Sequence, residues 1–463
     1  MHEQTCAPYA PTVGSCALGT RRRRSTGSLR LLAPVLFAIS LAGSPCLAAE
    51  PSAISSSGPD TTAGTLTLRD ALLRALRESP LLPDSSLELR AREAESLQAG
   101  LLPNPALTTE VEDFGGGGSR NAFDASQTTV SLAQLIELGG KRAARVRLAD
   151  ANADLARWDF ESIRIDVLSQ VAKAFLETVA AQDKLALTDE LLRIAEASVV
   201  TVARTVQSGA VSPVEEGRAK VLLSQVQIER EQRARDLDRA RVALAASWGS
   251  SDPTFVNAVG NLADVRKPEA LDRLWLDVER NPDLARWTTE LEQRAATLSL
   301  AEAQAVPDVT VSAGGRYYQD EGTGGVVALF SVPLPVFNRN QGAIQAAQNR
   351  LDRAKVERRV AEVSIRSSVA QAYQQLLAAY VQVVELRDRT IPQANTVFRG
   401  AQDAYARGLF RYIEVLDAQR TLFQLRATYV DALLAYHTQI TDIARLTGRD
   451  PSDGAVPASG VVP

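Results

Sequence analysis

Cysteine, methionine and histidine are scarce in this 463-residue sequence, and their scarcity removes whole classes of function. The three cysteines all precede residue 47, the only methionine is Met1, and the histidines are His2 and His437. Once an N-terminal export signal is removed, no cysteine is left for a disulfide or a thiolate metal site. Glycine-rich phosphate loops and clusters of acids outside predicted helix surfaces are also missing. We therefore expect no enzyme, no cofactor and no bound metal.

Residues 1–48 have the three regions of an export signal peptide. Arginines at residues 21–24 form the positive region, residues 31–42 form an apolar region too short to span a bilayer, and residues 46–48 form a small-x-small cleavage site. A twin-arginine signal needs apolar residues directly behind the arginines, and lipidation of Cys46 needs a small residue where Pro45 stands. We therefore predict plain cleavage just after these residues.

The net charge argues against a nucleic-acid partner. It is −4 for the whole chain, and removal of the predicted signal leaves 46 basic and 54 acidic residues, or −8. No apolar run long enough for a membrane-spanning helix follows residue 48, whereas abundant Ala, Leu, Arg, Glu and Gln with 5% aromatic residues favour long helices. If the protein crosses a membrane, it must do so by strands.

The sequence matches itself at three nearly equal offsets, 198, 199 and 202, in the same order along the chain. The matches join VAKAFLETVAA with VAQAYQQLLAA (from Val171 and Val369), Gly209 and Gly249 with Gly408 and Gly448, and Pro80 and Pro105 with Pro282 and Pro307. Chance alignment of Ala-rich helices does not explain matched prolines and glycines, which such helices avoid. We predict two tandem copies at residues 66–249 and 268–448, an equatorial linker at 250–267, and flexible tails at 49–65 and 449–463.

Each copy is predicted to contain the same elements. Two helices precede a hairpin of alternating strands, at about residues 104–138 and 307–337. A single helix on the order of 100 Å long follows, at about residues 141–207 and 342–407. A returning helix completes each copy, at residues 213–249 and 413–448.

These elements cannot be satisfied within one chain. Four strands cannot close a barrel of useful bore, and open strand edges are not tolerated in lipid. Two long antiparallel helix pairs also leave most of their apolar stripes unburied in a monomer. We therefore expect copies of the chain to share one barrel. The alternative, a non-channel periplasmic coiled-coil scaffold or adaptor, explains the helices but leaves the hairpins unused.

The segments QLIELGGKRAAR and VPLPVFNRNQGAI resemble the heavy-metal, CzcC-type branch of the TolC-like outer membrane efflux protein family. The resemblance implies a mainly α fold with a small β part. In the implied homotrimer, each chain contributes four strands to a shared transmembrane β-barrel and long antiparallel helices to a periplasmic α-helical barrel.

The same resemblance implies a passive exit duct in the outer membrane of a Gram-negative bacterium, extending into the periplasm. Its implied partners are a periplasmic adaptor (membrane fusion) protein and an inner-membrane RND pump of a tripartite system. The implied substrates are divalent metal ions of the cobalt, zinc and cadmium type. Organic drugs and secreted proteins are the alternatives.

Three groups of residues gain roles from this resemblance. Glu414 and Asp417, three positions apart on one helical face, would form acidic rings at the periplasmic mouth, although spacing alone favours a solvated surface. Contacts that close the mouth would involve Glu215 or its neighbour Glu216, Tyr405, and Arg411, which lies one step beyond the family's arginine position. The adaptor would dock at the glycine tips: Gly209, Ala210, Val211, Gly408, Leu409 and Phe410. The alternative is that the apolar residues of these tips pack together at the closed mouth.

The two hinges between strand and long helix form the remaining group. Glycine permits unusual backbone angles and proline blocks further strand pairing. Both therefore suit a change from strand tilt to helix tilt at the inner surface of the outer membrane. The hinge residues are Gly139, Gly140, Lys141, Pro333, Pro335, Asn338, Arg339, Asn340 and Gly342. The basic residues here, which include Arg142 and Arg145, would either lie close to outer membrane lipid headgroups or be simply solvated.

Overall fold

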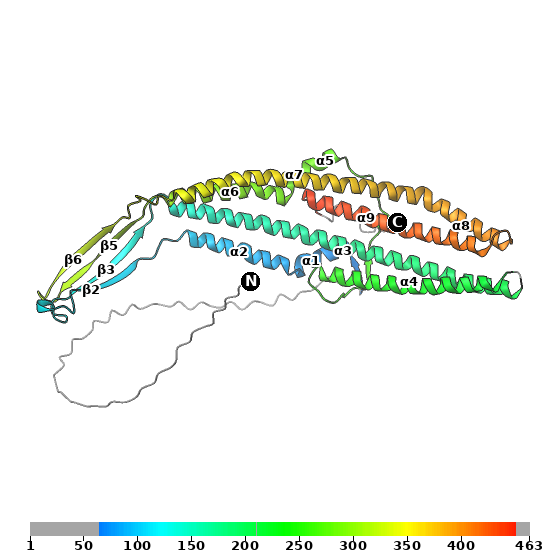
Figure 1. The fold of residues 1–463 in the computed structure, drawn as a ribbon, viewed down its shortest axis with the longest axis horizontal. Coiled ribbons are helices and arrows are strands. Elements are labelled where there is room, and N and C mark those ends of the chain that lie inside the picture. The colour runs from blue at the N-terminus through cyan, green and yellow to red at the C-terminus, as the bar shows by residue number, and fades with distance from the viewer. Residues whose placement is uncertain (1–63, 210, 451–463) are drawn as a thin grey trace, which may run out of the picture. The chain divides into compact units, whose positions relative to one another are not determined.

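The computed structural model describes residues 64–209 and 211–450, in which the same order of elements occurs twice (Figure 1). Each half contains two helices, a β-hairpin, a very long helix and a returning helix. The predicted signal peptide, most of both predicted tails and Ala210 lie outside the described residues. The mainly helical fold with two tandem structural repeats, predicted from the sequence, is confirmed.

The bounds of the elements follow chain order. The first half contains β1 (Thr65–Thr67), α1 (Leu68–Glu78), α2 (Leu81–Ala99), β2 (Ala106–Glu112), a 3-10 turn (Gly118–Arg120), β3 (Gln127–Ile136), α3 (Lys141–Gln207) and α4 (Pro213–Ala246). The second contains β4 (Asn257–Val259), α5 (Leu271–Asp277), a 3-10 turn (Val278–Arg280), α6 (Pro282–Ala303), β5 (Val309–Tyr318), β6 (Thr323–Ser331), α7 (Gln341–Glu385), a π turn (Leu386–Thr390), α8 (Ile391–Ala406) and α9 (Tyr412–Thr447).

The two hairpins form one antiparallel sheet with the order β2-β3-β5-β6. Its register gives one face of mostly apolar and exposed side chains, which include Leu107, Val130, Leu132, Val311, Val326 and Phe330. The other face is mostly polar and includes Glu110, Glu112, Thr129 and Arg316. The predicted alternation is therefore present, and β2 and β6 are the edge strands of this sheet.

The helices next to the sheet lie side by side in the same order as the strands. α2 packs against α3, α3 against α6, and α6 against α7 (Figure 1). Within the described part of the chain, α2 and α7 are thus the outer members of this helical layer, as β2 and β6 are of the sheet. Exposed apolar residues line both, with Leu87 and Leu97 on α2 and Val356, Val360 and Val363 on α7.

Each returning helix is followed by a glycine at the position that the repeat predicts. Gly249 and Gly448 both have left-handed φ angles, 90° and 68°. A Cβ atom at Gly249 would lie 2.7 Å from Cδ of Pro80, and one at Gly448 would lie 2.6 Å from the carbonyl oxygen of Arg280. Both glycines therefore allow close packing on the break between the first two helices of their own half.

Most buried apolar side chains belong to a central core around α3, α7 and α9. Its largest fully buried members include Phe175, Leu176, Leu244, Val369 and Val383. The linker between the halves is fastened to this core by two neighbouring residues of α9. The Tyr436 hydroxyl donates to the carbonyl of Arg266 (2.6 Å), and His437 Nε2 donates to the carbonyl of Leu262 (2.9 Å).

We expect His437 to make stability depend on pH. Burial lowers its pKa below the ordinary 6.5, against the opposing effects of its bond to Leu262 and of nearby Asp264. The unfolded chain therefore takes up a proton at about pH 6.5 while the folded chain does not, so the free energy of unfolding falls as the pH drops below that value. Denaturant unfolding near neutral and mildly acidic pH measures the decrease. His437→Gln should lower stability near neutral pH and flatten the dependence, and an unchanged slope in this variant would contradict the assignment.

The linker at residues 250–267 contains β4, which pairs in parallel with β1. The side-chain amide of Gln182 in α3 covers the other side of β4. Its Nε2 donates to the carbonyl of Ala258 and its Oε1 accepts from the Ala258 N–H, both at 2.8 Å. The predicted N-terminal tail is also one residue too long, since Thr65 belongs to β1.

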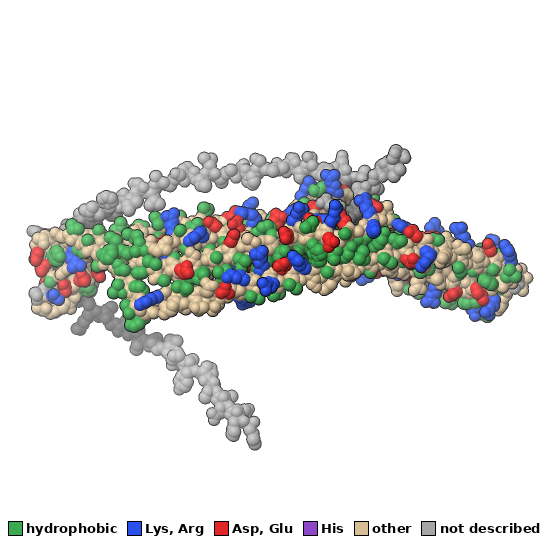
Figure 2. All heavy atoms as spheres, turned by 90° about the horizontal axis from the view of Figure 1, so that it is seen from above, with side chains coloured by type: hydrophobic (Ala, Val, Ile, Leu, Met, Phe, Trp, Pro, Cys, Tyr) green, Lys and Arg blue, Asp and Glu red, His purple; other side chains and the backbone are tan. Residues whose placement is uncertain are grey.

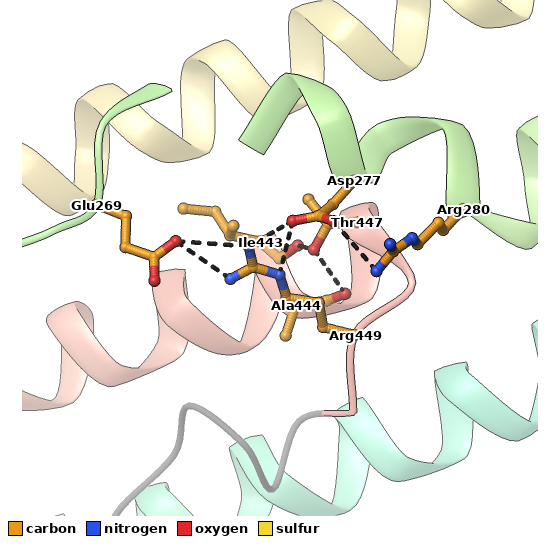
Figure 3. A network of polar contacts seen from close by, with 7 residues as sticks. All are labelled: Glu269, Asp277, Arg280, Ile443, Ala444, Thr447 and Arg449. Atoms are coloured by element: carbon orange, nitrogen blue, oxygen red, sulfur yellow. Dashed lines mark hydrogen bonds and ion pairs between the residues drawn. The ribbon is translucent and has the colours of Figure 1, made fainter. Parts of the chain in front are cut away.

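The predicted C-terminal tail begins too early in the chain, because Arg449 is held in place. Its guanidinium forms ion pairs with Asp277 and, at 3.4 Å, with Glu269, and Arg280 lies 3.4 Å from the same Asp277 (Figure 3). The Arg449 N–H also donates to the carbonyl of Ala444 (2.9 Å) beyond the last turn of α9. These long-range partners give no local signal in the sequence.

Two predicted helices differ from those observed. The returning helix of the first half ends at Ala246, three residues before Gly249, because the chain turns away there before the linker. The second long helix is not one α-helix to Arg407 but α7, a π turn and α8. The physical reason is Pro392, which has no N–H for helix hydrogen bonding and clashes with the carbonyl four residues earlier.

Charged side chains are spread over the helices, whereas hydrophobic side chains gather over the strands and their junctions with the helices (Figure 2). The most exposed of these apolar residues are Val326 and Phe337, each 91% exposed. Among the described residues, no helix combines the length and the apolar character that a membrane-spanning helix needs.

Candidate functional site

Two glycine turns reverse the direction of the long helices, at the opposite end of the described unit from the sheet (Figure 1). Gly209 follows α3 and Gly408 follows α8, with left-handed φ angles of 72° and 73°. After Gly408 the Leu409 N–H donates to the carbonyl of Ala404 (2.9 Å), as in a Schellman motif. Ser212 caps α4 by accepting from the Val214 N–H (3.3 Å). Ordinary helix-end rules therefore place both turns.

A second cluster, the tip core, joins α3, α4, α8 and α9 near these turns. Its buried members are Val202, Ala219, Phe398, Ala401, Tyr412, Val415 and Leu422. Outside it, Leu409 is 73% exposed and Phe410 is 49% exposed, while Val211 is half-buried. Exposed apolar side chains at a turn are unfavourable in water and favour a protein partner.

Glu414 and Asp417 lie on one face of α9, as their spacing predicts. Both line a groove of about 430 Å³ between α8 and α9, together with Val397, Phe410 and Ile413. Glu414 is half-buried, and its Oε2 atom is buried without a hydrogen-bond partner among the described residues, whereas Asp417 is exposed. The two carboxylates therefore open onto a shared, largely apolar surface.

Glu215, Tyr405 and Arg411 line another groove, of about 810 Å³, between α3 and the α8–α9 pair. Burial raises the pKa of Tyr405, and the nearby Glu215 carboxylate raises it further. Glu215 forms an ion pair with Arg218 at 3.1 Å, however, and Arg411 points to Glu414, with Nε 3.6 Å from Oε1. The three predicted mouth-closing residues share one groove. Within a single chain, however, Arg411 pairs with Glu414 and not with Glu215.

Tyr412 is a groove residue that the sequence analysis missed. Its ring lies 5.5 Å from that of Tyr405, and burial raises the pKa of its hydroxyl. Glu216, the alternative to Glu215, pairs with Lys220 at 2.6 Å. The available signal for Tyr412 is its place directly before a predicted helix, next to Arg411.

At the first hinge, glycine is required by shape. Gly139 and Gly140 have φ angles of 67° and 71°, and a Cβ at Gly139 would lie 2.7 Å from Cβ of Val306. Lys141 then forms an ion pair with Asp308 at 2.7 Å, and the Leu138 N–H donates to the same carboxylate at 3.1 Å. The first hinge is thus tied to the start of β5 in the other half.

Arg145 is also paired within the chain. It binds Glu137 through two nitrogens, at 2.6 and 3.1 Å, and donates to the carbonyl of Ala99 (2.9 Å). Neither Lys141 nor Arg145 is therefore a simply solvated charge. Asp308 is not singled out by the sequence, because it is far from Lys141 along the chain. Glu137 is not singled out either, because the glycines of the hinge separate it from Arg145.

At the second hinge, Asn340 takes the place that Gly140 has in the first. Its φ angle is 59°, and its side chain donates to the carbonyl of Ala301 (2.7 Å). The Arg339 side chain donates to the carbonyl of Pro335 (3.2 Å), and the Asn340 N–H donates to the side chain of Asn338 (3.0 Å). Pro333 lies just beyond the end of β6, and Gly342 lies in the first turn of α7.

Comparison with known proteins identifies the family. The model for outer membrane efflux proteins matches the chain twice, at residues 71–250 and 277–449. The chain belongs to this family. Among residues 64–209 and 211–450, no group of three or more His, Cys, Asp or Glu side chains could hold a metal ion.

Two named relatives of this efflux protein come from Cupriavidus metallidurans. Cobalt-zinc-cadmium resistance protein CzcC is 33% identical over 394 residues, which cover 84% of this chain and 92% of CzcC. Nickel and cobalt resistance protein CnrC is 28% identical over 309 residues, which cover 65% of this chain and 73% of CnrC.

Solved structures show the same fold. A crystal structure of CusC is similar with a TM-score of 0.72 at 19% identity, covering 82% of this chain and 92% of that one. A membrane protein from Pseudomonas aeruginosa has a TM-score of 0.71 at 22% identity, covering 85% of this chain and 91% of that one.

Proposed function

We propose that this chain is the outer membrane exit channel of a tripartite efflux system, not an enzyme, and that its substrates are divalent heavy-metal cations. The channel offers a path, a gate and docking surfaces, while an inner-membrane RND pump supplies the energy through a periplasmic adaptor. The observation that carries the proposal is the pair of unpartnered edges shared by the sheet and the helical layer of the described residues.

These edges favour a closed ring of copies. β2 and α2 form one edge of the described unit, and β6 and α7 form the other. In a head-to-tail ring, the β6 edge of each copy pairs with the β2 edge of the next, and the last copy pairs with the first. A ring of three copies would form a twelve-stranded barrel that continues into a barrel of helices. Such closure leaves no strand edge exposed to lipid.

The two faces of the sheet fit the two surroundings of such a barrel. The apolar face suits lipid and the polar face suits a water-filled lumen. On the polar face, Arg316 pairs with Glu112 (3.1 Å) and donates to Thr129 (2.8 Å). The hinges would then lie at the periplasmic surface of the outer membrane. There the exposed Arg142 and Arg339 are available to lipid headgroups.

Metal-ion substrates are supported by the names of the relatives and by the acids of the tip. CzcC and CnrC are named for resistance to cobalt, zinc, cadmium and nickel. Three copies of Glu414 and Asp417 around a common axis would lower the local potential and attract cations. Carboxylates alone bind such ions less durably than sites that add histidine or cysteine ligands, which suits a duct that must release what it carries.

The tip would serve closure and docking. Glu215 and Tyr405, together with Arg411 of a neighbouring copy, would hold the mouth closed. The turns at Gly209 and Gly408, with Val211, Leu409, Phe410 and Ala210, would receive the adaptor. A nucleic-acid partner is not part of this proposal, because the chain is acidic.

Fractionation and conductance test the proposal directly. The mature protein should be found in the outer membrane as an SDS-resistant trimer and should conduct ions in planar lipid bilayers. Deletion of its gene should raise sensitivity of the host to cobalt, zinc or cadmium. A water-soluble monomer without conductance would exclude a channel, whereas a conducting trimer whose loss changes only drug sensitivity would exclude the metal substrates alone.

A further inference from the structure

Charge on the polar face of the sheet is confined to the end far from the helices. Glu110, Glu112 and Arg316 are the only charged residues of the four strands that form the described sheet. The register places Glu110, Thr129 and Arg316 in one row across β2, β3 and β5, with Glu112 and Gln127 in the next row outward. Under the proposed function this end is the outer mouth, where the substrate leaves the channel.

The Arg316 guanidinium reaches across β3 to β2. Its Nε donates to Oγ1 of Thr129 (2.8 Å), its Nη1 donates to Oε1 of Gln127 (3.1 Å), and its Nη2 lies 3.1 Å from Oε2 of Glu112. On its other side the register places Gly325, which has no side chain to bind the guanidinium there. Arg316 therefore lies over β3, with its charge directed at β2.

The two glutamates of β2 differ in their surroundings. Because successive strand residues point to opposite faces, Glu110 and Glu112 share the polar face. Glu112 pairs with Arg316, whereas Glu110 is exposed and forms no ion pair within the described part of the chain. Each chain therefore contributes two acids and one base to this face, so three copies would contribute a net charge of −3, and −6 without Arg316.

Pairing of acids with arginines continues into the loop beyond β2. Gln127 Nε2 donates to Oδ2 of Asp113 (3.1 Å), and Oδ1 of Asp113 forms an ion pair with Arg120 (3.0 Å). Two consecutive acids, Glu112 and Asp113, are thus each paired with an arginine. The remaining acids of this end lie beyond the strands, in loops: Asp124, Asp320 and Glu321.

Two free carboxylates on one face of a strand can hold a divalent cation together. Side chains two residues apart on a strand lie about 7 Å apart, so one ion can contact an oxygen of each carboxylate. A cation held there would leave slowly, whereas conduction requires sites weak enough for the ion to depart. The Arg316 guanidinium occupies Glu112 and repels a cation that approaches Glu110.

We propose that Arg316 determines how readily divalent cations leave the channel, because it prevents Glu110 and Glu112 from binding them at the outer end. The proposal deepens and rests on the proposed function, because it concerns release of the same substrates. The acids of the tip would attract cations at one end, and Arg316 would favour their departure at the other. The alternative is that Arg316 only fastens β5 to β2 and β3. Its loss would then weaken the protein without changing how cations bind.

Block of the current by Co²⁺ added on the outer side tests the role of Arg316 in planar bilayers. Arg316→Gln should lower the blocking concentration about tenfold, because each copy gains a second free carboxylate. Arg316→Lys keeps the charge and should resemble the wild type. Arg316→Met is a second neutral variant for use if the glutamine variant does not fold. A folded, conducting neutral variant with wild-type block would overturn the proposal.

Removal of the partner acid provides the matched control. Arg316→Gln combined with Glu112→Gln leaves one free carboxylate per chain on this face, as in the wild type. This double variant should therefore regain the wild-type block. A double variant that is blocked as readily as Arg316→Gln alone would contradict the proposal, because Glu112 would then not be a ligand.

Equilibrium dialysis of the purified protein against Co²⁺ separates this proposal from the proposed function. Arg316→Gln should bind about one more Co²⁺ ion per chain than the wild type, and the double variant should not. Equal binding by all three proteins would overturn the role of Arg316. A wild-type protein that does not conduct would refute the proposed function, while dialysis would still decide what Arg316 does.

Discussion

Gly314→Val is expected to abolish recovery of folded protein from the outer membrane. A Cβ atom at Gly314 would lie 2.2 Å from the carbonyl oxygen of Val130 and 2.6 Å from Cα of Ser131, on the strand that β5 pairs with. Neither contact can relax by a side-chain rotation, because both atoms are backbone. We expect destabilisation by at least about 3 kcal/mol and loss of the SDS-resistant species on a gel of the outer membrane fraction.

The neighbouring glycine is a matched control for this substitution. A Cβ at Gly315 would have only the carbonyl oxygen of Gly325 nearby, at 3.9 Å, and would point to the apolar, exposed face of the sheet. Gly315→Val should therefore be recovered at close to the wild-type level. Equal loss of both variants would mean that β propensity or export determines how much folded protein is recovered. The close approach of β3 and β5 would then not be the cause.

Glu414→Ala together with Asp417→Ala should weaken block of the channel by divalent cations added on the periplasmic side. Three copies would lose six carboxylates from one constriction, and with them the local negative potential that holds a divalent ion. We expect the blocking concentration to rise about tenfold, equivalent to about 1.4 kcal/mol. Current recordings in planar bilayers at several cation concentrations measure the shift.

Glu231→Ala provides the control for the gate. This acid lies farther along α4 and forms an ion pair with Arg235 at 2.7 Å. Block should be unchanged in this variant. If the double alanine variant blocks like the wild type, Glu414 and Asp417 do not face the pore, and the channel proposal stands without this gate.

Much of the fold could be predicted from the sequence because its signals are local and occur twice. Glycines at helix ends, such as Gly209 and Gly408, repeat at one offset and adopt left-handed conformations that favour glycine. The alternation along β2 assigns Leu107, Thr109 and Val111 to one face of a strand from residue types alone. Positions whose backbone geometry favours a particular residue type, such as glycine at a helix end, can therefore be predicted from a single sequence.

The sequence predicts the partners of individual charges least well. Lys141 and Arg145 have the sequence context of free charges, yet each has a carboxylate partner that no sequence period predicts, which excludes simple solvation. Arg449 has the sequence context of a tail because Asp277 and Glu269 precede it by more than 170 residues. The break at Pro392, by contrast, has a local signal, because proline inside a helical pattern interrupts the helix.

The side-chain amide of Gln182 protects one edge of the β1–β4 ribbon while the protein is in the periplasm. A short parallel ribbon such as β1 with β4 would ordinarily offer its outer side to any passing extended peptide. The Gln182 amide already binds the Ala258 N–H and carbonyl there, so that side of the ribbon is closed to strand addition. Two newly exported chains therefore cannot pair with one another through this side of β4 before they assemble.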